Sequence, residues 1–123
     1  MTGIVCVPRP LLIRRLPTTM SDITQLHRAL IARVLDGDGK APTELRRAAF
    51  DNAGLGEPMR TLIEKVAYHA YRVTDEDVAA VGAAGLSEDQ IFEIVVCAAV
   101  GQASRQYAEA VASLASATEE GER

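Results

Sequence analysis

Aromatic residues are scarce in this sequence, which has no tryptophan and only five phenylalanine or tyrosine residues. Alanine is abundant instead, and 48% of all residues are hydrophobic. Small apolar side chains of this kind favour closely packed helices over a sandwich of aromatic-rich strands. The 123 residues are enough for one hydrophobic core but few for two. We therefore expect a single all-α domain.

Cysteine is equally scarce, since Cys6 and Cys97 are the only two and lie far apart in the sequence. They show no spacing typical of a metal site or a redox pair, so we expect a reducing, cytoplasmic location. Cys97 stands between Val96 and Ala98 in a fully apolar segment. A thiol in such surroundings is predicted to be buried and inert, with a raised pKa.

Clusters of positive charge and long apolar runs are also missing. The net charge is −4, and no group of Lys and Arg is interleaved with aromatics, so nucleic acid is not an expected partner. No apolar run approaches the ~20 residues that cross a bilayer, so we expect no membrane association. The Asp-Gly-Asp-Gly turn at 36–39 has the wrong ligand spacing for a calcium loop. We expect neither a metal nor a cofactor.

The beginning of the chain differs from the rest. Residues 1–19 contain three prolines and show neither helical periodicity nor the unbroken apolar segment of a secretory signal. We interpret them as a disordered N-terminal extension. Alternatively Met20 is the true start, because a capped helix follows it directly. The all-α domain is then expected over residues 20–118, with a polar tail at 119–123 that should fray.

Apolar periodicity and helix-breaking residues divide the domain into about five helices. The expected helices begin near residues 21, 42, 58, 75 and 88, and the last one ends near 117. Arg46 and Arg47 on the second helix are interpreted as a solvated face, and His27 on the first as an exposed residue. No segment shows the alternation that is typical of a strand.

Residues 74–101 contain the clearest local signals. Thr74 is followed by three acidic residues, as expected at the start of a helix, and Gly85 suits the positive φ that often ends one. Ser87 and Gln90 then form the S-x-x-Q pattern of a capping box before a nearly all-apolar helix. Gly101 lies inside that helix, where its cost of ~1 kcal/mol against alanine predicts close approach of a neighbouring backbone.

The run Gly85-Leu86-Ser87-Glu88-Asp89-Gln90, together with Glu93, resembles the AhpD-like superfamily, which includes carboxymuconolactone decarboxylases. The resemblance covers roughly residues 55–115. It implies a helical bundle with a C-terminal helical hairpin, and an assembly of three or six copies. A homo-oligomer is also expected from the residues themselves, because a last helix that is apolar all round needs more cover than four short helices supply.

The redox members of that superfamily carry a Cys-x-x-Cys pair and a following histidine. By the resemblance, the pair should fall near Ala70 and Val73 and the histidine near Asp77, and none of the three is present. Thiolate chemistry of the peroxiredoxin or alkyl hydroperoxidase kind is therefore not expected, because it needs both the attacking and the resolving cysteine. The decarboxylase members do not depend on the pair, so proton transfer at the same cavity stays open.

Two places offer candidate catalytic residues. Glu64, Lys65, Tyr68 and His69 form a compact polar set on the third helix, and His69 is its one side chain that titrates near neutrality. The alternative is a solvated helix face with an incidental Glu64–Lys65 pair. Glu93 is the second place, because an acidic side chain in an apolar segment requires a partner.

The last helix is expected to turn Glu93 toward the third helix. The predicted partner is Lys65, His69 or Arg72, in the same chain or in a neighbouring subunit. A structural ion pair is the simplest interpretation of such a contact, and participation in proton transfer is the alternative.

Two functions are favoured from the sequence, and a peroxidase-related redox protein is a third that the missing cysteines make least favoured. The first is a cofactor-free enzyme of the decarboxylase or isomerase kind that acts on a small molecule through Glu64, Lys65, His69 or Glu93. The second is a non-catalytic oligomeric module that binds a small ligand or another protein. A cavity with the polar set pointing inward would favour the enzyme, whereas the same residues spread over an outer surface would favour the module.

Overall fold

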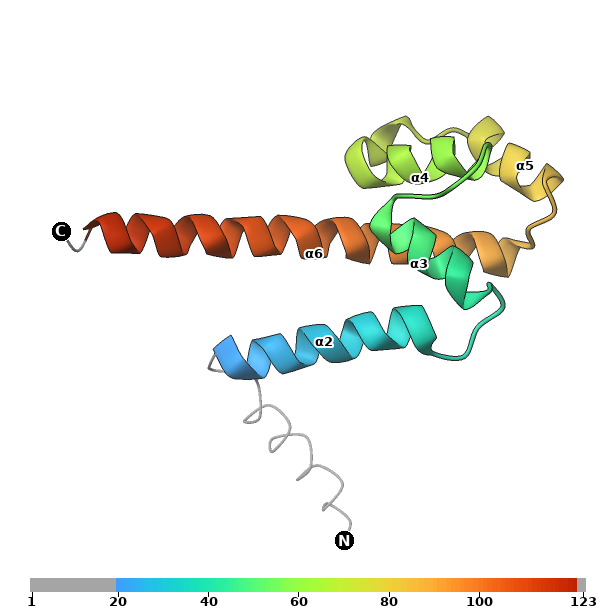
Figure 1. The fold of residues 1–123 in the computed structure, drawn as a ribbon. Coiled ribbons are helices and arrows are strands. Elements are labelled where there is room, and N and C mark those ends of the chain that lie inside the picture. The colour runs from blue at the N-terminus through green and yellow to red at the C-terminus, as the bar shows by residue number, and fades with distance from the viewer. Residues whose placement is uncertain (1–19, 122–123) are drawn as a thin grey trace, which may run out of the picture. The chain divides into compact units, whose positions relative to one another are not determined.

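The computed structural model describes residues 20–121, and the side chains of residues 22–119 (Figure 1). The expected extension at 1–19 lies outside the described residues. Everything described is helix or connecting loop, without a strand, so the all-α prediction is confirmed for this part of the chain. The helices are α2 (Met20–Asp36), α3 (Thr43–Asp51), α4 (Met59–Tyr68), α5 (Asp75–Ala83) and α6 (Glu88–Gly121), with a 3-10 turn, η2 (Ala70–Arg72), after α4.

The chain divides inside α2 into two units, residues 1–30 and residues 31–123. In the described part of the first unit, Ile23, Leu26 and Leu30 are large apolar side chains that remain exposed. His27, expected to be exposed, is partly buried. The second unit contains the hydrophobic core.

The core of the second unit is built around the first half of α6. One cluster joins Ile94 and Cys97 of α6 to Leu35, Ala49 and Ile63, which come from α2, α3 and α4. A second, smaller cluster joins α6 to α4 and α5; its buried members are Leu62, Val81 and Ile91. In Figure 1, α3, α4 and α5 accordingly gather along one part of α6, while the remainder of that helix extends past them.

Gly101 allows α3 to approach α6 closely, as predicted. A Cβ atom built on Gly101 would collide with the backbone of Phe50, whose carbonyl oxygen would be the nearest atom. The same carbonyl oxygen accepts a hydrogen bond of 2.8 Å from Nη1 of Arg105, one turn farther along α6. The absent side chain therefore permits a backbone contact that any larger residue would prevent.

The predicted helix caps are also present. Thr74 and Asp77 form a complete capping box at the start of α5, and Gly85 has a φ of 116° after its end. At the start of α6, Ser87 Oγ accepts from the Gln90 amide (3.2 Å) and Gln90 Oε1 accepts from the Ser87 amide (2.8 Å). These contacts join residues three apart, so local sequence is enough to specify them.

Two helix ends and the burial of α6 differ from the expectation. α4 ends at Tyr68, so Arg72 belongs to the 3-10 turn and not to the polar face of α4. α6 continues through Gly121, four residues beyond its expected end near 117. In addition, the first half of α6 is not enclosed on every side, because Phe92 is 69% exposed.

Candidate functional site

The structure divides the predicted catalytic residues between two separate pockets. Glu64, Lys65, Tyr68 and His69 line one pocket of about 270 Å³ on α4, which we call the α4 pocket. Glu93 lines a different pocket of about 150 Å³, formed by the end of α2, the loop that follows it, α3 and α6. A single site that uses Glu64, Lys65, His69 and Glu93 together is therefore not formed within the chain.

The α4 pocket is a shallow depression on the outer surface. Glu64 and His69 are exposed, and Tyr68 is 56% exposed. General acid–base catalysis depends on a group whose surroundings hold it in a useful protonation state, and these surroundings are close to bulk water.

Lys65 is the most constrained member of the set. Its Nζ lies 2.8 Å from Oδ2 of Asp77, and this oxygen also accepts from the Thr74 amide at 2.9 Å. The hydrogen bond from Lys65, followed by that from Thr74, lowers the pKa of Asp77. The expected Glu64–Lys65 pair is replaced by a link between α4 and the capping box of α5. The geometry gives Lys65 a structural role at this junction.

His69 stands at the end of α4. Its amide donates to the Lys65 carbonyl at 2.7 Å, and its ring meets the Tyr71 ring edge-on with centroids 6.0 Å apart. The guanidinium of Arg72 lies 5.7 Å from the centroid of the same Tyr71 ring. Among the described residues, no side chain forms a hydrogen bond or ion pair with the His69 imidazole, so nothing there orients it as a general base.

The predicted partner of Glu93 is wrong within this chain. Its carboxylate accepts backbone hydrogen bonds from Lys40 (2.9 Å to Oε1 and 2.8 Å to Oε2) and from Ala41 (2.7 Å to Oε1). The Lys40 bonds, then the Ala41 bond, lower the pKa of Glu93. The face of α6 that meets α4 carries Ile91 and Ile94, so Glu93 points instead toward the loop between α2 and α3.

Arg46 holds the same loop from the other side. It is 6% exposed, so its interpretation as a solvated residue is wrong, whereas its neighbour Arg47 is exposed. Its Nε donates to the Ala41 carbonyl at 2.9 Å, and its Nη1 donates to the carbonyls of Gly37 at 2.7 Å and Leu35 at 3.3 Å. These carbonyls lie at or just after the end of α2, where a helix leaves acceptors without partners.

Arg46 and Glu93 together form what we call the loop clasp. The arginine satisfies carbonyl groups of residues 35–41, and the glutamate satisfies amide groups of the same segment. Gln90 adds a bond of 3.1 Å from Nε2 to the Lys40 carbonyl. The sequence offered one signal for Arg46, because a residue three positions before the apolar Ala49 shares its face of the helix. In the structure Ala49 is fully buried on that face of α3.

The prediction that Cys97 is buried with a raised pKa is confirmed. It is completely buried, and its Sγ lies 3.3 Å from the Val34 carbonyl, to which the thiol donates. Burial raises its pKa, which disfavours the reactive thiolate. The other cysteine, Cys6, lies outside the described residues. Among the side chains of residues 22–119, no three His, Cys, Asp or Glu residues gather as metal ligands would.

Comparison with known proteins adds no relative. No family model, no curated protein and no solved structure matches this chain. The resemblance to the AhpD-like superfamily therefore stays a prediction from residues 85–93. Within residues 20–121, no helix is both long and apolar enough to cross a membrane.

Proposed function

We propose that this protein is a non-catalytic helical module that assembles with further copies of itself along the second half of α6. The α4 pocket supports the non-catalytic part of the proposal, because its polar side chains spread over an outer surface and Lys65 is committed to Asp77. The exposure of α6 beyond its core-forming half supports the assembly. All described side chains from Ala112 to Glu119 are exposed.

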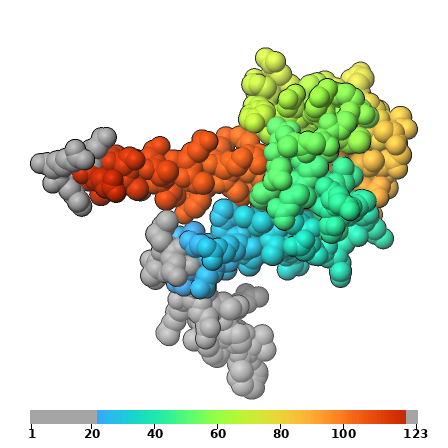
Figure 2. Space-filling view, in the orientation of Figure 1, coloured from blue at the N-terminus to red at the C-terminus, as the bar shows by residue number. Residues whose placement is uncertain are grey.

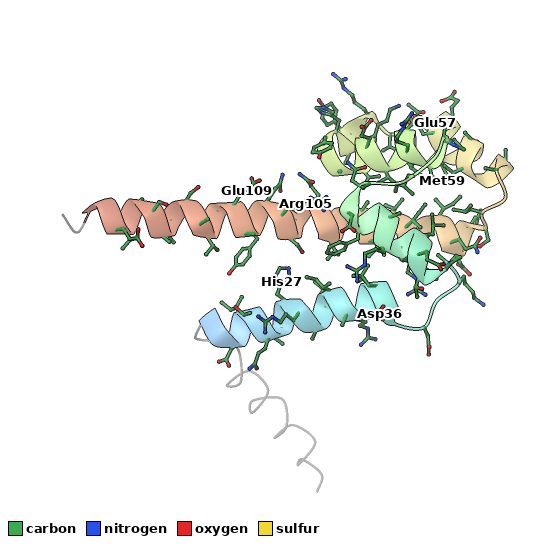
Figure 3. All side chains as sticks on the ribbon, in the orientation of Figure 1. His27, Asp36, Glu57, Met59, Arg105 and Glu109 are labelled. Atoms are coloured by element: carbon green, nitrogen blue, oxygen red, sulfur yellow. The ribbon has the colours of Figure 1, made fainter. Side chains whose placement is uncertain are left out.

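The exposed part of α6 carries an apolar stripe. Tyr107, Val111, Leu114 and Thr118 follow one another at intervals of four, three and four residues, the repeat by which helices pair in coiled coils. Leu114 is 68% exposed and Tyr107 is 41% exposed. Figure 2 shows this part of α6 extending beyond α3, α4 and α5, and Figure 3 shows side chains on several sides of it. We call these four residues the α6 stripe.

A second copy of the chain is the occupant that suits the α6 stripe. Exposed helices gain most of their stability by packing an apolar face, so the exposure of Leu114 and its neighbours on the stripe favours association. Arg105, Glu109 and Glu119 lie off the α6 stripe, on the outer side of such a pair, so the charges do not set its orientation. Figure 3 labels Arg105 and Glu109 on this part of the helix.

Light scattering coupled to size-exclusion chromatography tests the assembly. At micromolar concentration we expect at least twice the monomer mass of 13.2 kDa, and the value separates two copies from the three or six that the AhpD resemblance implies. Leu114→Asp should reduce the mass to one chain, because it buries a charge in the interface. Ser116→Asp adds the same charge two residues away, on the opposite side of the helix, and should leave the assembly intact. A wild-type monomer would refute the proposal.

A cofactor-free proton-transfer enzyme is the second candidate, and one observation favours it. Glu64, Lys65, Tyr68 and His69 do share one pocket, as a decarboxylase-like or isomerase-like site would require. Incubation with a panel of β-keto acids and unsaturated lactones in deuterated water, followed by NMR, tests it. Turnover should disappear in His69→Gln and persist in Tyr71→Phe, which lies beside the pocket. If the wild type showed no turnover, or if His69→Gln kept full turnover, the α4 pocket would be excluded as a catalytic site.

A further inference from the structure

The pocket beside the loop clasp, which we call the clasp pocket, combines opposite charges with an apolar wall. Arg33 and Arg46 supply positive charge, and Asp38 and Glu93 supply negative charge. The apolar wall is provided by Phe92 and Val96 of α6. The formal charges of these residues cancel. A purely anionic or purely cationic ligand would therefore meet repulsion as well as attraction.

Arg46 has a donor left over in this pocket. Its Nε and Nη1 are occupied by backbone carbonyls, but no described residue accepts a hydrogen bond from Nη2. No buried polar side-chain atom of the described residues lacks a partner, so Nη2 is in contact with solvent although the residue is 94% buried. A guanidinium that is immobilised on two of its nitrogens and open on the third is prepared to receive an oxygen acceptor.

Glu93 has acceptor capacity left over beside it. Its two oxygens receive three backbone hydrogen bonds, while a carboxylate offers about four positions. Gly39 keeps the space between the two groups free. A Cβ atom at Gly39 would lie 2.9 Å from Oε1 of Glu93 and 3.1 Å from Nη2 of Arg46. The missing side chain thus leaves a fixed donor and a fixed acceptor next to the same small space.

The apolar wall needs a different kind of contact. Phe92 is 69% exposed, although it lies in the most apolar segment of the chain. A ligand that met only the charges would leave this ring in water. An aliphatic group about the size of a leucine side chain would cover part of it, and burial of apolar area is favourable at about 25 cal/mol per Å².

We propose that the clasp pocket binds a small zwitterion with an aliphatic side chain, that is, a free apolar α-amino acid. Its carboxylate accepts from Arg46 Nη2 and from the exposed guanidinium of Arg33. Its ammonium donates to Asp38 and to the remaining acceptor position of Glu93. Its side chain packs against Phe92 and Val96. This site is independent of the α6 stripe, so it does not depend on the proposed assembly.

Titration of the full-length protein with L-leucine, followed by NMR and calorimetry, tests the site. We expect saturable binding with a Kd of the order of 1 mM or below, and shifts that include the Phe92 ring and the Val96 methyl groups. 4-Methylpentanoate keeps the carboxylate and side chain but lacks the ammonium, and 3-methylbutylamine lacks the carboxylate. Each should bind at least about tenfold more weakly, because each leaves one pair of charged protein groups without its partner.

Surface variants locate the binding without disturbing the loop clasp. Arg33→Gln, Asp38→Asn and Phe92→Ala change exposed side chains and should each weaken leucine binding at least about fivefold, with an unchanged melting temperature. Arg47→Gln removes an exposed charge outside the pocket and should bind as the wild type does, as should Leu114→Asp. The proposal is refuted if leucine produces no saturable shift up to about 10 mM. It is equally refuted if either analogue matches leucine, or if Arg33→Gln and Asp38→Asn bind normally.

Discussion

The two halves of α6 are similar in composition but have different surroundings. Both are rich in alanine and other small apolar residues. Within the second unit, the first half carries the fully buried Ile94 and Cys97 and receives α3, α4 and α5 on its sides. The second half carries Leu114 at 68% exposure. Apolar composition therefore predicts that a helix needs cover, but the rest of the chain decides which part of the helix receives it.

The loop clasp accounts for part of this difference. Arg46 and Glu93 pin the segment after α2 against the first half of α6, using the charged side chains to satisfy backbone groups. Asymmetric effects of mutation follow from this arrangement. Changes around the first half of α6 should alter the stability of the fold, whereas changes on the second half should alter association.

Replacement of Arg46 by methionine should have the largest effect on the stability of the fold. The variant keeps much of the side-chain volume but leaves the Leu35 and Ala41 carbonyls without a donor, and each buried unsatisfied group costs about 1–3 kcal/mol. We expect the free energy of unfolding to fall by about 3 kcal/mol in urea titrations. Arg47→Met on the exposed side of α3 should stay within about 0.5 kcal/mol of the wild type. Equal losses in both variants would contradict the loop clasp.

Replacement of Gly101 by alanine should come next. The new methyl group meets the Phe50 backbone, so α3 must move away from α6, and overpacking of this kind costs about 1–3 kcal/mol. Gly82→Ala in α5 is the matched control, because nothing lies within 4 Å of its added Cβ. It should gain up to about 1 kcal/mol from helix propensity. Thermal unfolding of both variants should thus show shifts of opposite sign.

Glu93→Gln should have a smaller effect that depends on pH. Backbone hydrogen bonds hold the folded-state pKa of Glu93 below its ordinary value of 4.5. The carboxylate therefore stabilises the fold fully above its unfolded-state pKa, and this contribution is lost as the pH falls through the lowered pKa. Near neutral pH we expect the variant to lose about 1–2 kcal/mol. The difference from the wild type should shrink in urea titrations below pH 4. If the difference in the free energy of unfolding between the two proteins stayed constant with pH, the charge of Glu93 would not contribute to stability.

Hydrogen exchange should show the smallest effect, confined to the second half of α6. Amides of residues 91–101 are expected to exchange slowly at any protein concentration, because core packing protects them. Amides of residues 107–118 should exchange faster in dilute protein and slow down as the concentration rises, because association covers the α6 stripe. Protection of 107–118 that is independent of concentration would mean that the helix needs no second copy.

The prediction of local structure from sequence worked because its causes are local. The capping boxes at Thr74 and Ser87 join residues three apart, and the positive φ of Gly85 follows from the turn that it makes. The close approach at Gly101 was also predictable, because a glycine inside an apolar helix carries a cost that only packing offsets. These features establish the all-α fold of the described residues without any knowledge of the tertiary arrangement.

The partners of the charged residues depended on the tertiary structure alone. Glu93 was expected to meet a cation on α4, but it meets backbone amides 52 and 53 residues earlier in the chain. Arg46 resembles Arg47 in sequence and differs only in the face of α3 that it occupies. A buried charge requires a partner, and a charged residue within an apolar segment of the sequence indicates this requirement. Which donor or acceptor meets it depends on how distant segments pack, because backbone groups occur at every residue and leave no signal in the sequence.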